Sequence, residues 1–187
     1  MPTTNPTKPI AIVGAGAMGS GIAQVAAQAG CSVILLDSQQ EALDRSKAAL
    51  QKVAARQVAK NRWSLDESEA IQARIHRTSE FEQVAECDLV IEAILEDLGA
   101  KTALFHSLEE CVKPSTILAT NTSSLSITAL AGTLRHPQRC IGLHFFNPAP
   151  LMALVEIVPA LQTSHDVIEQ CQSWLMDLDK SAVIARS

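Results

Sequence analysis

The stretch Ile10-Ala-Ile-Val-Gly-Ala-Gly-Ala-Met-Gly19 decides the fold of this 187-residue chain. A four-residue apolar run ends at Gly14, and a helical pattern over residues 18–29 follows the glycines directly. Gly14 permits a tight turn, Gly16 lets a pyrophosphate approach the backbone, and Gly19 lets the helix pack closely on the strand. The free N–H groups at the start of the helix favour an anion. The stretch therefore predicts a dinucleotide site, to which Met18 also belongs.

A second apolar run, residues 32–36, follows this helix and ends at Asp37. Strand, glycine turn, helix and strand form a βαβ unit of the expected length. Asp37 lies about 20 residues beyond the turn, where a carboxylate accepts hydrogen bonds from an adenosine ribose. A carboxylate repels a 2′-phosphate, and no Arg or Lys occupies positions 38–40, so NAD is favoured over NADP. The glycine pattern alone does not exclude FAD.

Beyond Asp37 the chain continues to alternate helical patterns with apolar runs. We expect helices at 40–61, 66–76, 97–112, 126–134 and 165–178, and strands at 88–93, 116–120, 139–144, 154–158 and 182–185. This order predicts an α/β, Rossmann-type domain with a doubly wound, mostly parallel sheet and helices on both faces. We expect residues 1–8 to be a disordered lead-in and residues 9–187 to be the NAD-binding domain.

Composition narrows the class of protein further. Hydrophobic residues make up 47% of the chain and aromatic residues 3%, which suits a parallel sheet covered by helices. A net charge of −5 argues against general nucleic-acid binding, and no apolar run is long enough to cross a membrane. The five cysteines show neither a C-x-x-C pair nor a zinc spacing, which predicts reduced thiols, a cytoplasmic protein and no metal site.

A basic stretch follows Asp37 and carries no acidic residue between positions 45 and 62. Two interpretations stay open for it. It can be a solvated helix face, or it can receive a second polyanion such as the phosphates of coenzyme A. Its six basic residues are Arg45, Lys47, Lys52, Arg56, Lys60 and Arg62.

The segment Ile141-Gly-Leu-His-Phe-Phe-Asn-Pro-Ala-Pro150, with Leu154-Val-Glu-Ile-Val158, resembles the L-3-hydroxyacyl-CoA dehydrogenase family. The resemblance extends over about residues 8–187 and matches the family's N-terminal NAD-binding domain. It implies that a C-terminal helical domain is absent from this chain, and that the full-length protein is a homodimer. The other matching segments are the glycine turn, Ile91-Glu-Ala-Ile-Leu-Glu96 with Lys101, and Ala119-Thr-Asn-Thr-Ser-Ser124.

The resemblance implies a catalytic group of three residues. His144 would take the proton of the substrate 3-hydroxyl, Glu156 would orient His144, and Ser123 would hydrogen-bond the substrate oxygen. From the residues alone, His144 can also be a packed strand histidine, and Ser123 can be a turn or cap serine. A carboxylate within the apolar run 154–158 needs a partner, and His144 is a candidate.

The resemblance also implies contacts with the cofactor and the substrate. Asn147 and Glu96 would line the nicotinamide end, with Lys101 nearby and Asn121 also at the cofactor. Lys60 falls where the family places a lysine that contacts coenzyme A. A serine that some members use for the same ligand is Val53 here, so that contact is in doubt.

The leading hypothesis is therefore an NAD-dependent enzyme that oxidises a 3-hydroxyacyl-CoA, as in the β-oxidation of fatty acids. Two alternatives remain. The chain can be an NAD-binding module that is inactive in isolation, or it can belong to a related sugar-acid dehydrogenase or a crystallin-like protein.

Overall fold

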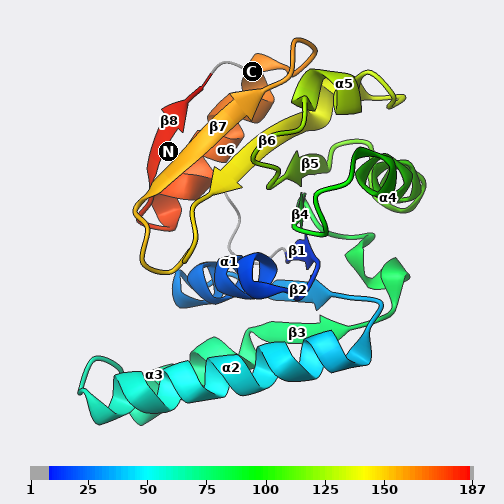
Figure 1. Cartoon of the computed structure of the whole chain (residues 1–187). Coiled ribbons are helices and arrows are strands. Elements are labelled where there is room, and N and C mark those ends of the chain that lie inside the picture. Colours follow the sequence, from blue (N-terminus) through cyan, green and yellow to red (C-terminus); the bar gives the residue numbers. More distant parts are fainter. Residues whose placement is uncertain (1–8, 186–187) are drawn as a thin grey trace.

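The computed structural model describes residues 9–185, so the predicted disordered lead-in at 1–8 lies outside the described residues. Within this range a single sheet of eight strands runs in the order β3-β2-β1-β4-β5-β6-β7-β8, from the bottom of Figure 1 to its upper left. The strands are β1 (Ile10–Val13), β2 (Val33–Leu36), β3 (Ile75–Thr78), β4 (Leu89–Glu92), β5 (Ile117–Thr120), β6 (Cys140–Phe145), β7 (Leu154–Pro159) and β8 (Ser181–Ile184).

Helices cover both faces of this sheet. One buried cluster joins apolar side chains of the strands to α1 (Ala17–Gln28), α2 (Gln40–Ala59), α3 (Leu65–Ala73) and α6 (His165–Asp177). The other cluster joins the opposite strand face to α4 (Leu98–Cys111) and α5 (Ile127–Ala131). The strand pairs are parallel except β6 with β7. The prediction of a Rossmann-type, mostly parallel sheet with helices on both faces is confirmed.

The predicted helix at 66–76 is wrong at its C-terminal end. Helix α3 stops at Ala73, and Ile75–Thr78 forms the edge strand β3, which pairs in parallel with β2. Ile75 and Thr78 are buried whereas His76 is exposed, so the segment shows too little alternation to signal a strand by itself. Pairing with β2 decides its conformation, which is a tertiary effect that local sequence does not carry.

Strands β6 and β7 follow each other without an intervening helix and pair in antiparallel fashion. Their register sets His144 directly opposite Glu156. Side chains of directly opposed residues lie on the same face of a sheet and are close enough to interact. The single antiparallel pair in the described sheet thus joins two residues that are 12 positions apart in the chain.

The five cysteines lie in or against the two buried clusters. All five cysteines are free thiols, and Cys87, Cys140 and Cys171 are buried. Burial raises the pKa of each of these three thiols to about 12, so they remain protonated at neutral pH.

Among the helices of residues 9–185, none combines the length and the hydropathy that a membrane crossing requires.

Candidate active site

The three glycines of the turn between β1 and α1 have different roles. Two are required by close packing, and the third borders open space. Gly14 has φ +106°, and a Cβ there would lie 2.6 Å from the carbonyl oxygen of Ala93. A Cβ on Gly19 would lie 1.8 Å from the carbonyl oxygen of Gly14. A Cβ on Gly16, the N-cap of α1, would meet no atom within 4 Å. Gly16 therefore borders open space at a helix N-terminus, which fits the pyrophosphate of a dinucleotide.

Asp37 connects the end of β2 to this turn. Its Oδ2 accepts a hydrogen bond from the Ala15 N–H at 2.7 Å, and its Oδ1 accepts one from the Gln39 N–H at 2.9 Å. Each carboxylate oxygen has a second lone pair that can accept from a ribose hydroxyl. Asp37, which is predicted to bind the ribose, thus also stabilises the glycine turn through its hydrogen bond with Ala15.

A cavity of about 310 Å³ borders Asp37 and Gly14 of the glycine turn. Its lining combines the polar side chains of Asp37, Ser38 and Ser79 with several apolar ones. This combination fits an adenosine, because the ribose needs polar partners while the adenine ring needs an apolar slot. The apolar lining comes from Val13, Leu36, Phe81, Ile94 and Leu104.

A second cavity of about 330 Å³ gathers most of the other predicted site residues. They come from α1 and α4, from the loops after β4 and β5, and from β6 with the loop that follows it. Residues far apart in the chain meet here because the parallel strands β1, β4, β5 and β6 end at one edge of the sheet. The predicted residues that line this cavity are Met18, Glu96, Lys101, Asn121, Ser123, His144 and Asn147.

His144 and Glu156 form a hydrogen-bonded pair behind this cavity. The distance between His144 Nδ1 and Glu156 Oε2 is 2.9 Å, and the two side chains are 20% and 35% exposed. The ring of Phe146 lies 4.5 Å from the imidazole, centroid to centroid, and is tilted by 49°. One nitrogen of His144 is therefore engaged by a carboxylate, and the ring is held from the side by an aromatic neighbour.

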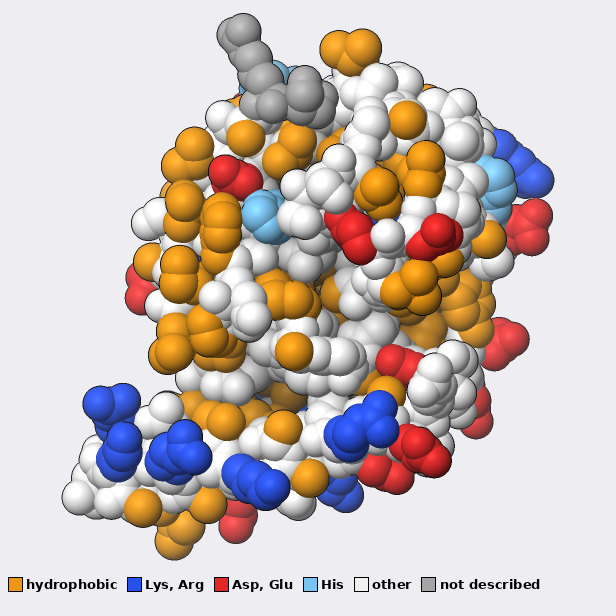
Figure 2. Space-filling model, viewed as in Figure 1, with side chains coloured by type: hydrophobic (Ala, Val, Ile, Leu, Met, Phe, Trp, Pro, Cys, Tyr) orange, Lys and Arg blue, Asp and Glu red, His pale blue; other side chains and the backbone are white. Residues whose placement is uncertain are grey.

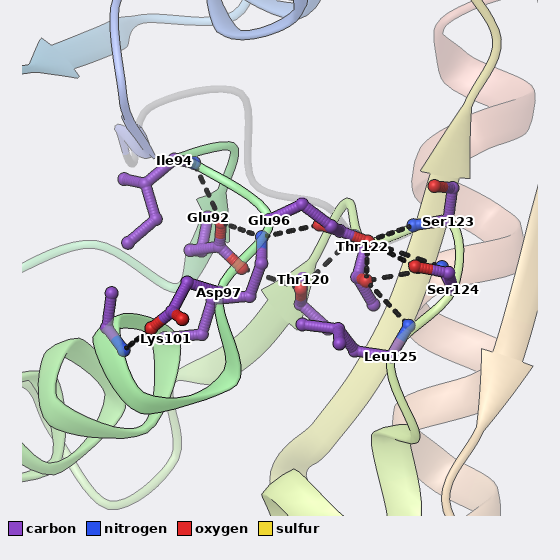
Figure 3. Close-up of polar contacts among 11 residues, drawn as sticks. Glu92, Ile94, Glu96, Asp97, Lys101, Thr120, Thr122, Ser123, Ser124 and Leu125 are labelled. Carbon is purple, nitrogen blue, oxygen red and sulfur yellow. Dashed lines mark hydrogen bonds and ion pairs between the residues drawn. The ribbon is translucent and has the colours of Figure 1, made fainter.

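Glu96 and Lys101, which line the second cavity, belong to a buried charge cluster whose other members, Glu92 and Thr120, were not predicted (Figure 3). Glu92 is fully buried at the end of β4, and its Oε1 lies 2.5 Å from Lys101 Nζ. Its Oε2 accepts a hydrogen bond of 2.6 Å from the Thr120 hydroxyl. Lys101 is only 1% exposed and also lies 3.3 Å from Glu96 Oε2. A signal existed, because Glu92 ends an apolar strand, just as Glu156 lies within one.

Glu96 connects this cluster to the loop after β5. Its Oε1 accepts hydrogen bonds from the Thr122 hydroxyl, from the Ser123 N–H at 3.1 Å, and from the Ser124 N–H at 3.3 Å. Burial by itself would raise the pKa of Glu96, but the hydrogen bond from Thr122 and the charge of Lys101 lower it to about 2. Glu96 is therefore an anion at neutral pH.

Two further predicted residues occupy different settings. Asn121 Oδ1 accepts a hydrogen bond of 2.9 Å from the Phe145 N–H, which links the end of β5 to β6. Lys60 is exposed at the end of α2 and is not among the residues that line the two cavities. It belongs to a row of exposed Lys and Arg side chains over α2, visible along the lower edge of Figure 2.

The fold and the two cavities define a dinucleotide-binding domain of the Rossmann type. Comparison with known proteins specifies the class. Residues 9–187 match the family described as "3-hydroxyacyl-CoA dehydrogenase, NAD binding domain". The chain therefore belongs to the 3-hydroxyacyl-CoA dehydrogenase family, and the cofactor of this domain is NAD.

Curated relatives are similar over most of the chain. A probable 3-hydroxybutyryl-CoA dehydrogenase of Deinococcus radiodurans is 48% identical over 83% of this chain and 55% of its own length. The 3-hydroxyadipyl-CoA dehydrogenase of Escherichia coli K12 is 42% identical over 95% of this chain and 38% of its own length. The chain thus spans about half the length of the curated relatives it matches.

Solved structures agree on the architecture. A crystal structure of a 3-hydroxybutyryl-CoA dehydrogenase from Escherichia coli K12 superimposes with a TM-score of 0.94 at 41% identity, covering 96% of this chain and 38% of that one. A (S)-3-hydroxybutyryl-CoA dehydrogenase from Ralstonia eutropha has the same TM-score at 34% identity, covering 96% and 64%. Prephenate dehydrogenase from A. aeolicus, at 13% identity and a TM-score of 0.68, shares the fold alone.

Proposed function

We propose that this domain works in an NAD-dependent L-3-hydroxyacyl-CoA dehydrogenase, which oxidises the 3-hydroxyl of an acyl-CoA to a ketone. The observation that carries the proposal is the His144–Glu156 pair beside a cavity that adjoins the glycine turn. Relatives named for 3-hydroxybutyryl-CoA and 3-hydroxyadipyl-CoA support a thioester substrate with a short acyl chain.

In this proposal His144 is the general base. When Nδ1 donates its hydrogen to Glu156 Oε2, Nε2 keeps a free lone pair and can accept the proton of the 3-hydroxyl. The imidazolium that forms is stabilised by the Glu156 carboxylate, which also fixes the orientation of the ring. Ser123 lines the same cavity and would donate a hydrogen bond to the substrate oxygen.

Residues of the two cavities would hold the cofactor. Gly16 and the N-terminus of α1 would receive the pyrophosphate, and Asp37 would bind the adenosine ribose. Met18, Asn121 and Asn147 would enclose the nicotinamide end, with Glu96 and Lys101 beneath it. When bound, NAD supplies the acceptor for the hydride that leaves C3 of the substrate.

The basic row on α2 would receive the phosphates of coenzyme A. Lys52, Arg56 and Lys60 are exposed and spaced by four residues, so they share one helix face. A nucleotide with several phosphates needs such a local cationic surface, because the chain as a whole is acidic. Lys60 is the member that we expect to contribute most.

His144→Gln tests the proposed function. In a protein that extends this domain to the length of its relatives, we expect the variant to oxidise NADH with acetoacetyl-CoA about 10²- to 10⁴-fold more slowly, since the imidazolium that would protonate the 3-oxygen in this direction is gone. His165→Gln is the matched control. His165 also lies beside a glutamate, at 3.3 Å from Glu169, but at an exposed helical position. Wild-type turnover in His144→Gln would refute the assignment.

The NAD-binding module without turnover is the second candidate, and the observation that favours it is the span of about half the relatives' length. Titrating the 187-residue chain with NADH and then assaying acetoacetyl-CoA reduction separates the two. Binding without turnover supports the module, and robust turnover refutes it. Oxidation of free hydroxy acids with NAD, compared with oxidation of 3-hydroxyacyl-CoA thioesters, tests a sugar-acid dehydrogenase.

We also propose that the whole protein is a homodimer in the cytoplasm. Five free cysteines support a reducing compartment. Sedimentation of the extended protein would report the oligomeric state, and a monomer would contradict this part of the proposal.

A further inference from the structure

The loop after β5 carries Ser123 to the rim of the second cavity. The neighbouring Thr122 is only 6% exposed and is not among the residues that line that cavity. A buried hydroxyl next to a proposed substrate-binding residue needs partners of its own. Those partners show how the loop is held.

Two side-chain oxygens, Thr122 Oγ1 and Glu96 Oε1, accept hydrogen bonds from three successive backbone N–H groups of this loop. Thr122 Oγ1 accepts from the Leu125 N–H at 3.1 Å and from the Ser124 N–H at 3.4 Å, while its own hydrogen goes to Glu96 Oε1. The same carboxylate oxygen accepts the Ser123 N–H. In Figure 3 the dashed line from Ser123 starts at its backbone nitrogen, and its hydroxyl lies apart from the Glu96 carboxylate.

Glu96 is ionised in this arrangement, because the hydrogen bond from Thr122 and the nearby charge of Lys101 stabilise the carboxylate. Lys101 supplies the compensating charge at 3.3 Å from Glu96 Oε2. An ammonium that is 99% removed from solvent needs a buried counter-charge, and Glu92 supplies it at 2.5 Å. The Ser123 loop is therefore coupled to a buried chain of charges at the end of β4.

We propose that Thr122 is a positioning residue of the dehydrogenase site, acting through Glu96 to hold the loop so that the Ser123 hydroxyl faces the cavity. The part that concerns substrate rests on the function proposed above. The part that concerns the loop does not, because it can be measured without substrate.

Thr122→Val keeps the shape of the side chain and removes the hydroxyl. In the 187-residue chain, we expect hydrogen exchange at the Ser123 amide to accelerate about tenfold, since Glu96 loses its hydrogen bond from Thr122. The Ser123 amide is informative because it donates to Glu96 and not to Thr122 itself. Thr122→Ser restores the hydroxyl, so we expect exchange close to wild type.

Thr116→Val is the matched control. Thr116 is fully buried, and its hydroxyl donates to the Cys87 carbonyl oxygen at 2.8 Å, away from the site. The control loses a comparable buried hydrogen bond, but we expect the exchange of Ser123 to remain as in wild type relative to global stability.

Two further measurements separate positioning from a merely structural role. Carbon NMR of the Glu96 carboxyl should show its pKa rise from about 2 toward the usual range in Thr122→Val, and return in Thr122→Ser. In the extended protein, kcat with acetoacetyl-CoA should fall about tenfold while the affinity for NADH stays within about twofold.

An unchanged rate of Ser123 exchange in folded Thr122→Val would overturn the proposal. Should that variant not fold, Glu96→Leu gives a second test, since it removes the oxygen that accepts from Thr122 and from the Ser123 N–H. Retained protection of Ser123 in Glu96→Leu would overturn it equally. Lost protection in a protein without acyl-CoA turnover would leave the positioning role standing and refute the proposed function alone.

Discussion

At the scale of single residues, the two carboxylates beside Lys101 differ in their surroundings. Glu92 and Glu96 face the same lysine, yet Glu92 is fully buried whereas Glu96 is 39% exposed at its side chain. Glu96 is also the partner that accepts hydrogen bonds from the loop after β5.

Glu96 makes stability depend on pH in a defined direction. Its pKa in the folded chain, about 2, lies below the ordinary value of 4.5, so ionised Glu96 favours the folded state. This contribution is complete above about pH 5 and is lost as the pH falls toward about 2. We expect the difference in unfolding free energy between wild type and Glu96→Gln to shrink over that interval in urea titrations. A constant difference would contradict the assignment.

Asp37 combines ligand binding with support of the turn. In Asp37→Asn the amide group can accept only one of the two backbone hydrogen bonds, from Ala15 and Gln39. We expect the affinity for NADH to fall about tenfold and the free energy of unfolding to drop by about 1–3 kcal/mol. Fluorescence titration and urea unfolding measure both effects. Asp44→Asn, on the exposed face of α2, is the control and should leave both unchanged.

At the scale of elements, the turn between β1 and α1 contains one glycine needed for packing, Gly19, and one that borders the ligand space, Gly16. Gly19→Ala would place a methyl group 1.8 Å from a carbonyl oxygen, so α1 must move away from β1. We expect a loss of about 3 kcal/mol in urea unfolding, as for other overpacked sites.

Gly16→Ala makes the complementary change in the same turn. Gly16 has φ −69°, which any residue adopts, and its added methyl group meets no protein atom within 4 Å. We expect stability to stay within about 0.5 kcal/mol of wild type. NADH binding should nevertheless weaken strongly, because the methyl group occupies the space for the pyrophosphate. Normal NADH affinity in Gly16→Ala would place the dinucleotide elsewhere.

Elements differ in how far the sequence predicts them. Strand β1 and helix α1 are readable because an apolar run, three glycines and a helical period follow one another within 20 residues. Strand β3 is not readable, since its two buried residues, Ile75 and Thr78, lie on opposite faces and give no alternation, and the pairing with β2 decides its conformation. The cluster around Glu92 was missed because its partners, Lys101 and Thr120, come from other elements.

At the scale of the whole molecule, the two cavities lie along one edge of the sheet and take residues from both of its halves. Val13 and Asp37 belong to the first cavity, His144 and Asn147 belong to the second, and Ile94 lines both. A ligand that fills both cavities would contact β1, β2 and β6 and the loops that follow β4 and β5. Its binding energy would thus stabilise the entire sheet.

We therefore expect NADH to stabilise the chain globally. At a concentration 100 times its Kd, the free energy of unfolding should rise by about 2.7 kcal/mol. Calorimetry with increasing NADH measures this shift, and Gly16→Ala should abolish most of it. A rise in the variant equal to that in wild type would show that the ligand does not use the turn.

The antiparallel pairing of β6 with β7 limits where residues can be inserted into this part of the chain or deleted from it. His144 meets Glu156 through strand register, so inserting one residue within β7 would turn the carboxylate to the opposite face of the sheet. The connecting segment, residues 146–153, can change length at its exposed Leu151 without altering that register. Insertions and deletions in descendants of this sequence should accordingly collect in the connection and be absent from the two strands.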